Sequence, residues 1–129
     1  MGSAVILALT PKENPQQNID HIAAIYRNLG SQAAEQVVAR ALGELAVMMS
    51  SLAEQIAEHD LADLMRRLRR LDQMADNLGL VTLSQVAQDL AQCLDRGEPT
   101  AFSAVWARLM RVAEMTLSVQ ADVQDQTSV

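Results

Sequence analysis

The chain has 129 residues, half of them apolar, and carries a net charge of −6 at neutral pH. This length fits one domain with a real core, and the acidic balance argues against general nucleic-acid binding, which needs a cationic surface. No apolar run approaches the roughly 20 residues that span a bilayer, and the first residues lack the basic stretch of a signal peptide. The single cysteine cannot form a disulfide bond within the chain. We therefore expect a cytoplasmic protein that acts neither on a membrane nor on nucleic acid.

Good helix formers are abundant, while glycine and proline are scarce, which predicts an all-α fold. Residues 1–17 hold two of the three prolines and a polar run, and we interpret them as a flexible N-terminal arm. Apolar residues at three- and four-residue steps predict a first helix over residues 19–29. Asn18 is its expected N-cap, and Gly30 is expected just beyond its end.

The second predicted helix follows Ser31, as N-cap, and continues to about Glu58, a length of roughly 40 Å. Gly43 within it is expected to permit close approach of another helix. The third helix is predicted to begin after Asp60, as N-cap, and to stop at Gly79. The apolar side chains expected to face the core from these two helices are Ala34, Val37, Val38, Ala41, Leu45, Met48, Met49, Leu52 and Ile56, and then Leu61, Leu64, Met65, Leu68, Leu71, Ala75 and Leu78.

Thr82 and Gln85 have the spacing of a capping box and predict the start of a fourth helix, which should end at Gly97. Pro99 suits the first turn of a fifth helix. Short turns between long helices predict antiparallel neighbours, and hence an up-and-down four-helix bundle with an additional N-terminal helix. The predicted bundle domain covers residues 18–120, and residues 121–129 are expected to form a flexible tail.

Residues 69–80 read Arg-Arg-Leu-Asp-Gln-Met-Ala-Asp-Asn-Leu-Gly-Leu. They resemble the signature helix of the histidine-phosphotransfer (HPt) family, whose pattern is His-x-Leu-Lys-Gly-x-Ala-x-x-Leu-Gly. The packing positions of that pattern are kept as Leu71, Ala75, Leu78 and Gly79. The resemblance implies an HPt-like four-helix bundle that acts in two-component phosphorelay signalling.

This resemblance covers about residues 35–117, but the functional positions depart from it. Arg69 stands where the family has its phosphoacceptor histidine, and a guanidinium group offers no lone pair for nucleophilic attack. Asp72 replaces a lysine that screens the phosphate charge, and Gln73 replaces a glycine that leaves room for the partner. Since steps of three and four residues bring side chains together on a helix, we expect all three departures on one face.

We therefore expect a non-catalytic module, an HPt-like protein that docks a receiver domain or a histidine kinase without carrying phosphate. Arg66, Arg67, Arg69 and Arg70 hold four of the ten basic residues of the chain. A cationic face of this kind would steer toward the acidic pocket of a receiver domain. The simpler interpretation is a solvated helix face. The predicted contact residues are Arg66, Arg69, Arg70, Asp72, Gln73 and Asp76.

Two alternatives stay open. The first is an active phosphotransfer protein that uses a relocated histidine, His59 or His21, although the simpler interpretation places both in solvent at helix ends. The second is a helical oligomerisation or adaptor protein, for instance a homodimer formed through apolar residues exposed on the second helix. Neither histidine has a metal-ligand partner at helical spacing, so no metal site and no cofactor are expected. Cys93 is expected to be a small buried apolar residue.

Overall fold

The computed structural model describes residues 19–127, and within that range every regular element is a helix, as the composition predicted. None of the described helices is long and apolar enough to cross a bilayer. The predicted arm at residues 1–17 and the cap at Asn18 lie outside the described residues. The helices are α2 (Ile19–Leu29), α3 (Ser31–Ala57), α4 (Leu64–Asn77), α5 (Val81–Arg96) and α6 (Pro99–Thr127).

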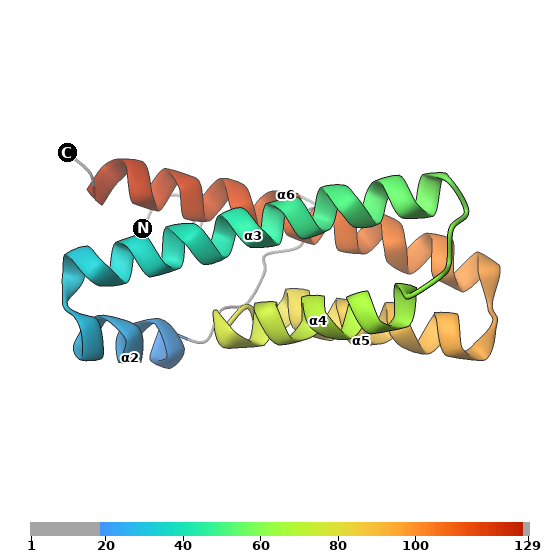
Figure 1. Cartoon of the computed structure of the whole chain (residues 1–129), viewed down its shortest axis with the longest axis horizontal. Coiled ribbons are helices and arrows are strands. Elements are labelled where there is room, and N and C mark those ends of the chain that lie inside the picture. The colour runs from blue at the N-terminus through green and yellow to red at the C-terminus, as the bar shows by residue number, and fades with distance from the viewer. Residues whose placement is uncertain (1–18, 128–129) are drawn as a thin grey trace, which may run out of the picture.

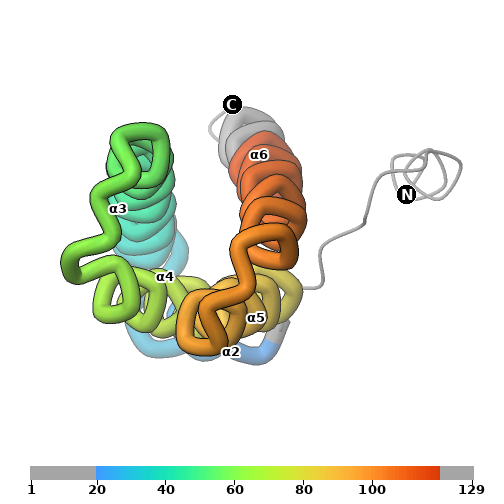
Figure 2. The backbone as a smooth tube through the Cα atoms, turned by 90° about the vertical axis from the view of Figure 1, so that its right-hand side faces the viewer, coloured from blue at the N-terminus to red at the C-terminus, as the bar shows by residue number. Residues whose placement is uncertain are grey.

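Helices α3 to α6 run alternately in opposite directions, as short connections require (Figure 1). Viewed end on, α4 and α5 lie side by side and form a base, from which α3 and α6 rise as two walls (Figure 2). The helix α4 packs mainly on α5, and α5 packs on α6. The short α2 folds back beneath the start of α3 and meets the C-terminal end of α4 (Figure 1).

One aliphatic core joins the base to the two walls, and leucine is its main component. Its side chains leave water almost completely, and burial of each leucine contributes about 1.5–3 kcal/mol. The largest fully buried members are Leu45 and Leu52 from α3, Leu64, Leu68 and Leu71 from α4, Leu83, Val86 and Leu90 from α5, and Leu109 and Val112 from α6. Phe102, Val105 and Trp106 pack against this core from α6 but stay partly exposed.

Three glycines lie at turns between successive helices. Gly30, Gly79 and Gly97 have φ angles of 80°, 69° and 64°, in the left-handed region that a side chain disfavours. The predicted helix ends at Gly79 and Gly97 are therefore confirmed. Gly30 occupies the N-cap position of α3 and Ser31 is the first helical residue, so the prediction of a Ser31 cap is wrong.

The start of the third predicted helix is wrong by about one turn, because α4 begins at Leu64. Asp60 does not cap a helix, since its Oδ1 accepts a hydrogen bond from the Ala62 amide at 3.1 Å within the preceding loop. Leu61, predicted to face the core, is 56% exposed in this loop. Asp63 precedes the helix in a left-handed conformation with φ of 60°.

The predicted capping box at the fourth helix is also wrong. The helix α5 begins at Val81 with Leu80 as its N-cap, which places Thr82 in the first turn, where it is 7% exposed. The amide of Ser84 donates to the Leu80 carbonyl at 3.0 Å. Leu80 itself is buried, so core packing rather than a side-chain cap fixes the start of this helix.

Two further expectations fail on α3. No described atom lies within 4 Å of the position that a Cβ atom would take at Gly43, so none of the described helices approaches there. Val37 is 44% exposed rather than buried, and Val47 is also exposed, but the Arg40–Glu44 ion pair lies between them on α3. The exposed valines therefore form no continuous apolar stripe. The helix α6 continues to Thr127 and so includes most of residues 121–129, which were expected to form a flexible tail.

Candidate functional site

The basic residues of α4 border a hollow of about 640 Å³ on the side of the molecule where α4 meets α3. We call it the arginine hollow and define it by the residues that line it, which are Met48, Arg66, Arg67, Arg69, Arg70 and Gln73. Helical geometry explains the grouping, because residues three and four apart on α4 share one face. The sequence prediction thus placed Arg66, Arg69, Arg70 and Gln73 together correctly.

Three of the four arginines are available to a ligand. Arg66, Arg69 and Arg70 are exposed, and Arg66 forms one solvent-exposed ion pair with Asp63 at 3.3 Å. Within the described side chains Arg69 and Arg70 form no ion pair. An exposed pair such as Arg66–Asp63 contributes at most about 1 kcal/mol, so it yields readily to a stronger partner.

Arg67 has a different role, because it points back to α3. Its guanidinium donates hydrogen bonds to the side-chain oxygens of Ser51 and Gln55. Gln55 is nearly buried, and its amide nitrogen donates in turn to the Ala62 carbonyl at 2.6 Å. Arg67 therefore fastens α4 and the loop before it to α3, and it forms one wall of the hollow with a fixed charge.

Asp72 does not belong to the arginine hollow, which corrects the prediction that all three departures share one face. Its carboxylate accepts hydrogen bonds from the Ser84 hydroxyl and from Gln88 Nε2 on α5, the latter at 3.2 Å. Successive residues of a helix are turned by about 100°, so Asp72 and Gln73 point to different neighbours. Asp72 thus holds α4 against α5 instead of facing the hollow.

Asp76 lies at the other end of α4 and is exposed, but it does not line the hollow. Its backbone carbonyl accepts a hydrogen bond from Nδ1 of His21 at 2.9 Å. His21 is consequently half-buried against α4. The simpler interpretation of the sequence, which placed it free in solvent, is therefore wrong. The contact fastens α2 to the C-terminal end of the helix that carries the arginines.

The chemistry open to the arginine hollow is recognition of an anion. Guanidinium groups donate paired hydrogen bonds to carboxylate or phosphate, and they do so as fixed cations. None of the six lining side chains carries an imidazole, a thiol, a hydroxyl or a carboxyl group, so the hollow holds no side chain that could accept a phosphoryl group. Among the described residues no cluster of three potential metal ligands occurs either.

The predicted contact residues did not include Met48 or Arg67, which line the hollow, and they included Asp72, which is directed to α5. Met48 belongs to the apolar stripe of α3, and only the register between α3 and α4 shows that it borders the arginines. The partners of Arg67 and Asp72 lie 12 or 16 residues away in the sequence on neighbouring helices. Helical periodicity within α4 carries no information on such contacts.

Comparisons with protein-family models, with curated proteins and with solved structures gave no match to this chain.

Proposed function

We propose that helices α3 to α6 form an HPt-like antiparallel four-helix bundle, to which α2 is added, and that the protein is a pseudo-phosphotransfer module of two-component signalling. In this proposal it binds a receiver domain or a histidine kinase through the arginine hollow and carries no phosphate itself. The alternating helix directions and the kept packing residues Leu71, Ala75, Leu78 and Gly79 support the likeness, since the first three are buried.

The observation that carries the proposal is the position of Arg69. It replaces the phosphoacceptor of the family pattern, and its side chain is exposed beside Arg66 and Arg70 in a hollow without a nucleophile. A permanent cation at that point can occupy the acidic pocket of a receiver domain but cannot take its phosphoryl group. The module would thereby sequester a partner or block its productive encounter.

The test is a binding measurement with matched charge reversals. Purified receiver domains from the source organism, with and without acetyl phosphate, are titrated calorimetrically with the wild-type protein, Arg69→Glu and Arg111→Glu. Arg111 is an exposed arginine on α6, away from the hollow, and it controls for the change in net charge. We expect Arg69→Glu to weaken binding by at least about 1 kcal/mol and Arg111→Glu to have little effect. Equal affinities for all three proteins would reject the docking surface, and so would absence of binding by every receiver domain and every histidine kinase of the source organism titrated in the same way.

A second candidate function is phosphotransfer through His21, and one contact favours it. A carbonyl oxygen only accepts a hydrogen bond, so Nδ1 of His21 carries the proton that it donates to Asp76, and in the neutral ring Nε2 has a lone pair. A ring oriented in this way can act as a nucleophile. His59 is exposed but forms no such orienting contact among the described residues. Loss of label in His21→Ala but not in His59→Ala, after incubation with a phosphorylated receiver, would establish this function.

A further inference from the structure

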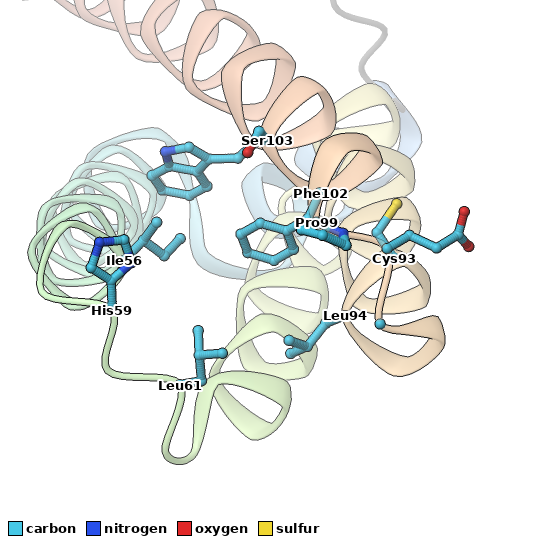
Figure 3. Close-up of a pocket in the computed structure, with 11 residues that line it drawn as sticks. Ile56, His59, Leu61, Cys93, Leu94, Pro99, Phe102 and Ser103 are labelled. Carbon is cyan, nitrogen blue, oxygen red and sulfur yellow. The ribbon is translucent and has the colours of Figure 1, made fainter.

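A second concave surface lies at the opposite end of the base from α2, where α3, α5 and α6 approach one another. We call it the aromatic cleft, and its volume is about 550 Å³. Its walls come from the end of α3 and the following loop, from the end of α5 and from the first turns of α6 (Figure 3). The lining residues are Ile56, His59, Leu61, Cys93, Leu94, Gly97, Glu98, Pro99, Phe102, Ser103 and Trp106.

The walls of this cleft are apolar and aromatic. Phe102 and Trp106 are two of only three aromatic residues in the chain, and both keep part of their surface exposed here. Ile56, Leu61 and Leu94 surround the Phe102 ring, and Leu61 is more than half exposed at the mouth (Figure 3). A concave apolar surface of this volume is typical of a small-ligand site.

Catalysis by a cysteine–histidine pair is not available in the cleft. Cys93 and His59 lie on opposite sides of it, with Phe102 between them in the view of Figure 3. A base must stand within hydrogen-bond reach of a thiol to activate it. The cleft is therefore a place for binding.

The rim of the cleft is acidic. Glu98 lines it directly, and Asp95 follows the lining residue Leu94, whereas Glu58 and Asp60 line a different hollow together with Arg66 and Arg67. The carboxylates of Glu98 and Asp95 are exposed, and neither forms an ion pair with another described side chain. Arg96 is the one arginine within residues 93–98, so the carboxylates of this segment outnumber it.

We propose that the aromatic cleft binds a hydrophobic organic cation, with the apolar body of the ligand against Phe102, Leu61 and Leu94 and its positive centre facing the acidic rim. Two features select this class over a neutral or anionic ligand. Aromatic faces attract cations through their quadrupole, and the indole of Trp106 does so most strongly. The unpaired carboxylates add an attractive field that an anion would have to oppose. This site is independent of the arginine hollow.

The test uses a pair of ions that share size and shape but differ in sign. Tetraphenylphosphonium and tetraphenylborate are titrated separately into the full chain, and the emission of Trp106, the only tryptophan, is followed. We expect a saturable change with the phosphonium ion, weakened by added salt, and at least tenfold weaker binding of the borate.

Two matched pairs of variants locate the binding site. Leu61→Ser removes an exposed apolar wall of the cleft, and Val47→Ser removes a valine that is 70% exposed elsewhere on the surface. Glu98→Gln removes a rim charge, and Glu114→Gln removes an exposed charge farther along α6. We expect Leu61→Ser to weaken phosphonium binding about three- to tenfold and Glu98→Gln about two- to fivefold, with the two control variants unchanged. None of these side chains is buried, so the fold is kept.

Several outcomes would overturn the proposal. Equal or tighter binding of the borate would exclude a cation site, and an unchanged affinity in Leu61→Ser would place the bound ion elsewhere. Absence of any saturable response to the phosphonium ion would exclude this class of ligand. If sedimentation shows a dimer that the phosphonium ion dissociates, a second copy of the chain is the occupant and the proposal is wrong.

Discussion

Replacement of Arg67 by methionine removes the charged link between α4 and α3 while keeping a long apolar side chain. Arg67 donates to Ser51 and Gln55, and Gln55 is only 7% exposed. Each hydrogen bond from a charged group contributes about 1.5–3 kcal/mol, and the half-buried position of Arg67 reduces this sum through solvent screening. We expect the free energy of unfolding to fall by about 2–3 kcal/mol, since the Gln55 oxygen also loses its partner.

The matched control is Arg69→Met on the same helix. The Arg69 side chain is exposed and forms no hydrogen bond or ion pair with a described residue, so the stability change should stay within about 0.5 kcal/mol. Urea unfolding, followed by circular dichroism and extrapolated linearly to water, measures both variants. For a chain of this size the thermal midpoint of Arg67→Met should drop by roughly 5–15 °C. Equal stability of the two variants would refute the division of the arginines into one that holds the fold and three that face a ligand.

Three other substitutions test the account of α4 and its neighbours. Leu71→Ala should lower the free energy of unfolding by about 2–5 kcal/mol, because Leu71 is fully buried and a cavity is left, and an unmoved unfolding midpoint would contradict its place in the core. Asp72→Ala should cost about 1–3 kcal/mol, since the nearly buried Ser84 hydroxyl loses its acceptor, while binding to a receiver domain stays unchanged in calorimetry. Gly97→Ala should cost about 1 kcal/mol in urea unfolding, entirely from its φ of 64°, because the added methyl group meets no atom within 4 Å.

The sequence predicted the helices better than their ends. Periodic leucines such as Leu68 and Leu71 fix the buried face of α4, and Gly79 and Gly97 fix the corners, because these signals are local. The start of α4 could not be predicted, since Leu61 and Asp63 lie in a loop that Gln55 of α3 holds through the Ala62 carbonyl. Side-chain contacts between helices are not encoded in periodicity.

The candidate site was likewise predictable only where it depends on spacing within one helix. The cluster of Arg66, Arg69, Arg70 and Gln73 follows from spacing on one helix and was predicted correctly. Asp72 lies between them in the sequence but is directed to α5, where Ser84 offers a hydroxyl that the sequence does not mark. The aromatic cleft could not be predicted, because its walls come from three helices and a loop.

The central claim is that the position of Arg69 binds a partner and does not accept a phosphoryl group. In the most direct measurement, the wild-type protein is incubated with a receiver domain that carries radiolabelled phosphate. Gel filtration then detects complex formation, and denaturing electrophoresis at neutral pH detects transfer of the label. We predict a complex in which all label stays on the receiver. A labelled band at the mobility of this chain, stable in base and lost in acid, would contradict the account.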